Sequence, residues 1–104
     1  MAAYMIILAR IHDRERFISG YAQQAAQLVA QFGGEYVLRA PGAICLEGSL
    51  GDDQSVVISQ WPSIQAARAF WDSPEYQSVK ALRDGICDVE VMLVEAPLIE
   101  QGPS

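Results

Sequence analysis

The stretch of residues 63–84 constrains the fold most strongly, because it predicts two short helices separated by a break. Ser63 is placed to cap the first helix. The run Ser73-Pro74-Glu75 then combines a cap, a proline at the first helical position and an acidic residue near the positive end of the helix dipole. Strand-like runs flank the stretch on both sides, so we expect a bent helical layer that packs on a sheet.

The rest of the chain predicts an α+β protein with the order β-α-β-β-α-β, which is the order of a ferredoxin-like fold. A long amphipathic helix is expected between Asp13 and Phe32, and Gly33 ends it. Right-handed crossovers place both helical layers on one face of an antiparallel sheet. The expected strands cover residues 3–11, 35–39 with a continuation at 44–49 after a bend, 55–61 and part of 86–96.

Several of these strands are apolar on both faces, although the helices can cover only one face of the sheet. In the first strand, Ile6 and Leu8 point one way, whereas Met5 and Ile7 point the other. A large uncovered apolar patch is rare on a soluble monomer. The sequence therefore predicts a two-fold homodimer in which two sheets pack face to face.

Length and charge limit the domain organisation and the partners. The 104 residues fit a single domain, expected at residues 1–96, with a C-terminal tail at 97–104. The chain has 7 basic and 13 acidic residues, a net charge of −6 and no basic run, so neither nucleic acid nor a membrane is an expected partner. The apolar run at residues 4–9 is too short to span a bilayer.

Cys45 and Cys87 are the two cysteines, and His12 is the single histidine. They form no CxxC pair and supply too few ligands for a zinc site, so no metal and no cofactor is expected. We interpret the two cysteines as reduced thiols, which predicts a cytoplasmic protein.

Four segments carry a family resemblance: the runs GGEYVLR, VVISQWPS and AARAFWDSPEYQSVKALRD, and the triplet Leu46-Glu47-Gly48. They resemble the DUF1330 family, a group of uncharacterised proteins in the dimeric α/β-barrel superfamily, over residues 2–96. The resemblance implies a ferredoxin-like protomer and a barrel-forming homodimer, and no established reaction. Cofactor-free quinol oxygenases of this superfamily use an Asn and a Trp in the pocket. Trp61 or Trp71 could supply the second, but this chain contains no Asn.

Three side chains are candidates for chemistry. His12 lies at an expected strand-to-helix junction, where it could carry protons at a pocket mouth or could be an exposed loop residue. Arg39 could hold a carboxylate or phosphate in a fork, and Glu47 could be a general base or a polar wall. Arg39 and Glu47 could instead belong to a surface or interface ion pair.

Tyr36 and Trp61 are the aromatics expected nearest a pocket between sheet and helices, with core packing as the alternative. Glycine-rich nucleotide motifs and nucleophile elbows are absent. We therefore expect a small homodimer with a pocket for a small molecule that has an apolar body and could be anionic. The alternative is a cofactor-independent enzyme for oxygenation, isomerisation or proton transfer, with His12 or Glu47 as base and Arg39 as anion clamp.

Overall fold

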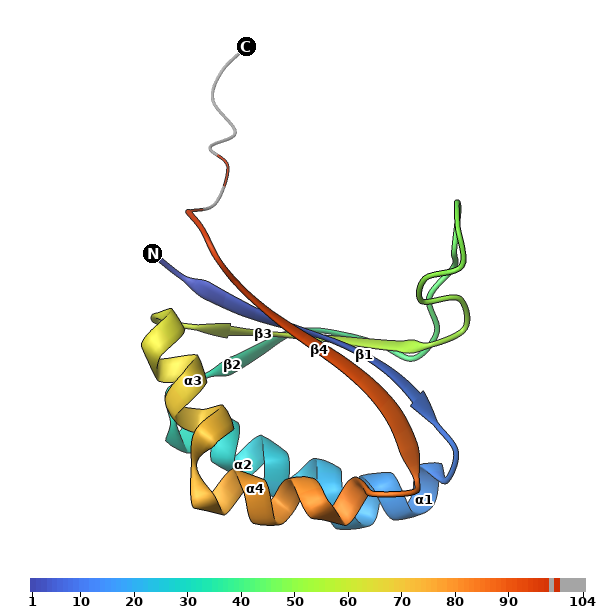
Figure 1. Ribbon diagram of the computed structural model, residues 1–104, viewed down its shortest axis with the longest axis horizontal. Helices are drawn as coiled ribbons and strands as arrows, with labels where there is room; N and C mark the ends of the chain where they lie inside the picture. Colours follow the sequence, from blue (N-terminus) through green and yellow to red (C-terminus); the bar gives the residue numbers. More distant parts are fainter. Residues whose placement is uncertain (98, 100–104) are drawn as a thin grey trace.

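The computed structural model describes residues 1–97 and residue 99. Four antiparallel strands form one sheet in the order β2-β3-β1-β4, and helices cover one face of it (Figure 1). This confirms the α+β, ferredoxin-like fold class. The strands are β1 (Ala3–Ile11), β2 (Glu35–Ala40), β3 (Ser55–Trp61) and β4 (Cys87–Glu95). The tail expected at residues 97–104 lies largely outside the described residues.

Two helical layers pack on the sheet. The first consists of α1 (Arg14–Arg16), the π-helical segment η1 (Phe17–Ala22) and α2 (Gln23–Gln31). The second consists of α3 (Ile64–Asp72), α4 (Pro74–Lys80) and the 3-10 turn η2 (Ala81–Arg83). Among the described residues, no helix is long and apolar enough to cross a membrane.

The second layer breaks where the sequence predicts. Ser63 Oγ accepts a hydrogen bond of 3.1 Å from the first turn of α3, and Ser73 Oγ accepts one of 3.1 Å from the backbone N–H of Tyr76 in α4. Ser73 is buried, and its hydroxyl also donates to the Phe70 carbonyl at 2.8 Å. The last turn of this layer tightens into η2, where Leu82 is 47% exposed.

The first layer was expected to be one continuous helix, but it contains the π-helical segment η1. Both predicted ends are present. Asp13 Oδ1 accepts a hydrogen bond of 3.1 Å from the backbone N–H of Arg16, and Gly33 adopts a φ of +91° just after α2. Between these ends, η1 widens the helix before α2 resumes. Such widened turns occur often at functional sites.

The strand continuation expected at residues 44–49 is wrong. Residues 41–54 instead form a loop that stands away from the sheet, on the side opposite the helices (Figure 1). Its apolar side chains Ile44, Leu46 and Leu50 are 83%, 95% and 68% exposed. The pairing of β2 with β3 ends at Ala40, and beyond it the loop keeps a single isolated bridge between Ala43 and Asp52.

The hydrophobic core fills one end of the space between the sheet and the helices. Trp61 at the end of β3 packs on Phe70 of α3, with ring centroids 5.0 Å apart, and Phe70 packs on Tyr76 of α4 at 4.4 Å. In the sheet, Trp61 pairs with Ala3, whereas Val57 pairs with Ile7 further along β1. The half of the sheet around Ile7 is therefore not filled by this aromatic cluster.

The centre of the sheet face opposite the helices is apolar across all four strands. One row of paired residues runs over it, from Leu38 in β2 through Ile58 in β3 and Ile6 in β1 to Met92 in β4. At the two ends of this row, Leu38 is 43% and Met92 is 51% exposed. We call this row and its neighbours the outer face.

Candidate functional site

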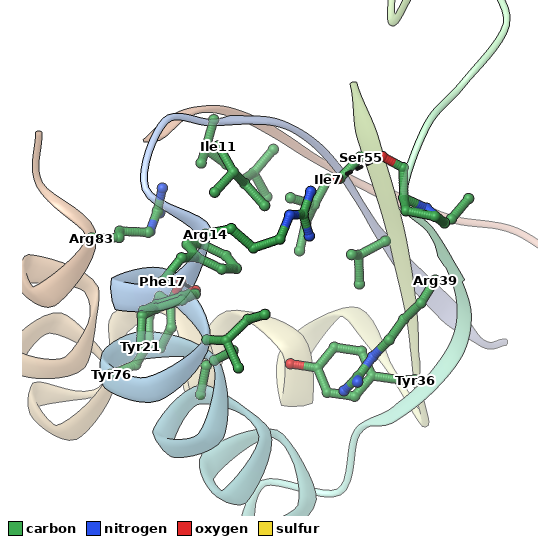
Figure 2. Close-up of a pocket in the computed structure, with 18 residues that line it drawn as sticks. Ile7, Ile11, Arg14, Phe17, Tyr21, Tyr36, Arg39, Ser55, Tyr76 and Arg83 are labelled. Carbon is green, nitrogen blue, oxygen red and sulfur yellow. Dashed lines mark hydrogen bonds between the residues drawn. The ribbon is translucent and has the colours of Figure 1, made fainter. Parts of the chain in front are cut away.

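A cavity of about 290 Å³ lies between the sheet and the first helical layer, at the end of the molecule that the aromatic core leaves open (Figure 2). β1 contributes Ile7 and Ile11 to its wall, and η1 contributes Phe17 and Tyr21. Most of the wall is apolar. The polar side chains that interrupt it are Arg14, Tyr21, Tyr36, Arg39, Ser55, Tyr76 and Arg83.

Tyr36 and Arg39 both line the cavity because of a bulge in β2. Side chains alternate along a regular strand, so residues three positions apart would face opposite sides of the sheet. The pairing with β3 shifts between Tyr36 and Leu38, which leaves Val37 as an extra residue and returns Arg39 to the helix-covered face. The Arg39 guanidinium carbon then lies 4.5 Å from the centre of the Tyr36 ring.

The electrostatic setting keeps the Tyr36 hydroxyl protonated. Burial raises the pKa of this half-buried phenol, and the Arg39 guanidinium opposes that shift only in part. Tyr36 can therefore donate a hydrogen bond from its hydroxyl into the cavity, beside a guanidinium that can form paired hydrogen bonds to a carboxylate.

A second polar group lies on the other side of the cavity in Figure 2, where Tyr21 of η1 meets Tyr76 of α4 and Arg83 of η2. The two phenol oxygens are 2.6 Å apart and share a hydrogen bond. The Arg83 guanidinium carbon lies 5.5 Å from the centre of the Tyr21 ring. Burial, followed by the neighbouring Tyr76, raises the pKa of the Tyr21 phenol well above its ordinary value.

The charges around the cavity are one-sided. Three of the 7 basic residues of the chain, Arg14, Arg39 and Arg83, line it, whereas within the described part of the chain none of the acidic residues does. A second hollow, of about 310 Å³, lies beside α3. Its lining carries no net charge, because it includes one basic residue, Arg68, and one acidic residue, Asp72. The first cavity is therefore a positive site in a protein whose net charge is −6.

The structure places the other predicted site residues away from this cavity. Trp61 is 1% exposed, and its Nε1–H donates to Ser59 Oγ at 2.9 Å. A Cβ atom at Gly34 would lie 2.7 Å from the Trp61 indole, so the glycine makes room for this ring in the core. Of the three residues proposed to bind a ligand, the cavity therefore brings together Tyr36 and Arg39.

His12 and Glu47 also lie outside the cavity. His12 Nε2 is 2.9 Å from Asp88 Oδ2, and the two side chains are 48% and 79% exposed. Glu47 is an exposed residue of the loop formed by residues 41–54. In the part of the chain that the structure describes, no group of three His, Cys, Asp or Glu residues is arranged to hold a metal ion.

Sequence reasoning missed Arg14, Tyr21, Tyr76 and Arg83 as site residues. Tyr21 and Tyr76 fall on helical stripes that predict packing, and both do pack against aromatic neighbours. One signal was available, because Arg14 and Arg16 sit in the first helical turn, where positive charge is unfavourable. A basic residue in that position suggests a role other than helix stability.

The fold and the cavity together define the class of protein: a small ferredoxin-like α+β domain with a cavity lined by three arginines. The chain belongs to the DUF1330 family, described as a domain of unknown function, whose model matches residues 2–97. The search of curated proteins found no match.

Solved structures share the fold at low sequence identity. A protein of unknown function from Rhodopseudomonas palustris has a TM-score of 0.77 at 19% identity, covering 95% of this chain and 84% of its own. A dimeric ferredoxin-like protein of unknown function from Jannaschia sp. has a TM-score of 0.69 at 13% identity, and the match covers 92% of this chain and 100% of that protein. SnoaB, a cofactor-independent oxygenase from Streptomyces nogalater, has a TM-score of 0.68 at 19% identity, and the match covers 97% of this chain and 98% of SnoaB. These similarities show the fold alone.

Proposed function

We propose that this protein binds a small organic anion with an apolar body in the cavity between its sheet and its first helical layer. Arg39 and Arg14 hold the anionic group, with the Tyr36 hydroxyl as an additional donor. The observation that carries the proposal is the lining of the cavity, in which three guanidinium groups and no described carboxylate surround a largely apolar space.

Three like charges at one cavity repel one another, although solvent screens part of that repulsion because Arg14 and Arg39 are exposed and only Arg83 is half-buried. Elsewhere in the chain acidic residues outnumber basic ones, so carboxylate partners were available to the sequence. An anion in the cavity would offset the repulsion between the three arginines. A carboxylate suits them, since a guanidinium can donate two parallel hydrogen bonds to it.

The size of the cavity limits the ligand. About 290 Å³ lies at the lower edge of the roughly 300–1,000 Å³ that is usual for small-molecule pockets. The apolar wall favours a hydrocarbon or aromatic body over a sugar or a nucleotide. We therefore infer a compact acid of one ring or a short chain.

The proposal is tested by a thermal-shift panel of small aromatic and aliphatic carboxylates, each paired with its neutral amide. Carboxylates should raise the unfolding temperature more than their amides do. For a carboxylate that binds, Arg39→Met should weaken affinity about tenfold or more, because it removes a charge-assisted hydrogen bond. A panel in which no carboxylate differs from its amide would overturn the proposal.

The outer face supports a homodimer, with a second copy covering it sheet against sheet. The apolar row from Leu38 to Met92 spans all four strands. The 41–54 loop, which carries exposed apolar residues, stands on the same side of the sheet (Figure 1). The similar protein from Jannaschia sp. is described as dimeric. Two copies in this arrangement would form the barrel that the family resemblance implies. The free cysteines Cys45 and Cys87 fit a reducing, cytoplasmic setting.

The enzymatic alternative is a cofactor-independent reaction on the same acid, and the fold similarity to SnoaB favours it as the second candidate. Because His12 and Glu47 do not line the cavity, the proton-carrying groups that do are the tyrosine hydroxyls. A substrate panel on the wild type and His12→Ala separates these roles. We expect His12→Ala to bind ligands as the wild type does, and a loss of turnover in it would return His12 to the mechanism.

A further inference from the structure

We propose that Tyr21, Tyr76 and Arg83 form a second polar subsite, which binds a phenolic or enolic oxygen at the end of the ligand away from its carboxylate. The proposal rests on the function proposed above and makes it more specific. The ligand class it defines is a flat hydroxy acid, with a carboxylate at one end and an ionisable hydroxyl at the other.

The hydrogen-bond capacity of the two tyrosines leads to this assignment. Each phenol has one hydrogen to donate, and the 2.6 Å contact between their oxygens uses one of the two. The hydroxyl that accepts this bond still has its own hydrogen to donate. Because Tyr76 is 3% exposed and both residues line the cavity, that hydrogen can be directed to a ligand atom there.

Arg83 adds a cation, whose guanidinium lies over the Tyr21 ring. Its Nε is buried and has no hydrogen-bond acceptor among the residues that the structure describes. A buried guanidinium N–H without an acceptor is costly, and such groups in native proteins call for an explanation. A ligand oxygen at this end of the cavity would offset that cost and would receive positive charge as well as the phenol hydrogen.

The subsite favours an oxygen that carries negative charge. A phenol hydrogen and a guanidinium N–H are both donors, and no described carboxylate at the cavity competes for them. Burial raises the pKa of the Tyr21 phenol, which therefore stays a protonated donor instead of becoming a tyrosinate. An oxygen held by a protonated phenol beside a cation is stabilised as an oxyanion.

The two polar groups define the ends of the ligand. Figure 2 shows Tyr36 and Arg39 on one side of the cavity, and Tyr21, Tyr76 and Arg83 on the other. The remainder of the wall is mostly apolar, with aliphatic side chains such as Ile7 from the sheet. A molecule that satisfies both ends must carry an oxygen at each and a hydrophobic, compact middle.

The test uses 4-hydroxycinnamate and 4-methoxycinnamate, which differ in whether the far oxygen can ionise. Calorimetry on the full chain should show that 4-hydroxycinnamate binds about tenfold more tightly. The double variant Tyr21→Phe/Tyr76→Phe should remove that preference, because either single variant leaves one hydroxyl in place. Arg83→Met alone should also reduce the preference for 4-hydroxycinnamate. Arg39→Met should weaken the binding of both acids to the same extent.

A spectroscopic readout separates this role from a merely structural one. The absorbance of bound 4-hydroxycinnamate reports whether its phenol is ionised. In the wild type, the pH at which half of the bound ligand is phenolate should lie about one unit lower than in the double variant. Thermal unfolding of each ligand-free variant shows whether it is folded, and Arg83→Met keeps the test informative if the double variant is not.

The outcomes are distinct. If neither acid binds the wild type, the proposed function fails, and the second subsite fails with it. If both bind equally well, or if the preference survives the double variant and Arg83→Met, the second subsite is wrong and the anion-binding function stands. If Arg39→Met abolishes the preference while the double variant weakens both acids alike, the two ends are reversed and the assignment is overturned.

Discussion

Single residues decide the character of the cavity. Arg14 and Arg16 are two positions apart in α1, and both are exposed, but only Arg14 lines the cavity. The pair therefore offers a comparison in which charge and helix position are nearly the same. Any difference in ligand affinity between matching variants of Arg14 and Arg16 measures the contribution of a position at the cavity.

Arg14→Met should weaken the binding of a carboxylate such as cinnamate about threefold to tenfold, since it removes one of three positive charges near the ligand. Arg16→Met should change the affinity by less than about twofold. Titration calorimetry at low salt measures both. Equal effects in the two variants would mean that the arginines act through the general field of the surface.

The raised pKa of Tyr21 predicts how stability depends on alkaline pH. In the unfolded chain this phenol loses its proton near pH 10.0, whereas in the folded protein burial keeps it protonated. Since the folded state then holds a proton that the unfolded state has lost, the free energy of unfolding should fall as pH rises above about 10. Urea unfolding between pH 9 and 11 should show that the free energy of unfolding declines less steeply with pH in Tyr21→Phe than in the wild type. An identical slope in the two proteins would contradict a raised pKa at Tyr21.

At the level of elements, the sequence predicts regular structure well and its irregularities poorly. The caps at Ser63 and Ser73, the break at Pro74 and the stop at Gly33 follow from local backbone chemistry, and the structure has all of them. The bulge at Val37 has no comparable local signature. It arises from pairing with β3, which is a tertiary interaction.

The spacing of apolar residues in the first helix gives a weak indication of the π-helical segment. The apolar stripe of the first helix takes four steps over 15 residues, an average of 3.75 residues a step, through Phe17, Tyr21, Ala25, Leu28 and Phe32. That spacing exceeds the 3.6 residues of an α-helical turn. The candidate site depends on both irregularities, since η1 carries Tyr21 and the bulge directs Arg39, and for this reason only part of it could be predicted.

Ser73 has two roles in the second helical layer. Ser73→Ala removes the cap of α4 and the hydrogen bond to Phe70, and should lower the free energy of unfolding by about 1–2 kcal/mol. Ser78→Ala, at an exposed position of the same helix, should change it by less than about 0.5 kcal/mol. Urea unfolding compares them, and a negligible effect at Ser73 would show that α4 does not depend on its cap.

For the whole molecule, the exposed apolar outer face predicts assembly. Leu38→Glu/Met92→Glu places two charges on that face and should convert a dimer into monomers, because burying unpaired carboxylates is costly. Leu82→Glu is the matched control, since Leu82 is an equally exposed apolar residue on the helical side. Light scattering at micromolar concentration should give two chains for the wild type and the control. A wild type of one chain's mass would contradict the dimer.

Anion binding in the cavity is tested most directly by calorimetric titration of the wild-type protein with cinnamate and with cinnamamide. The two ligands share a shape and differ in charge. The positive lining predicts that cinnamate binds at least about tenfold more tightly than the amide, and that added salt narrows the difference. Equal affinity for the two, or no heat from either, would contradict the assignment of the cavity as an anion site.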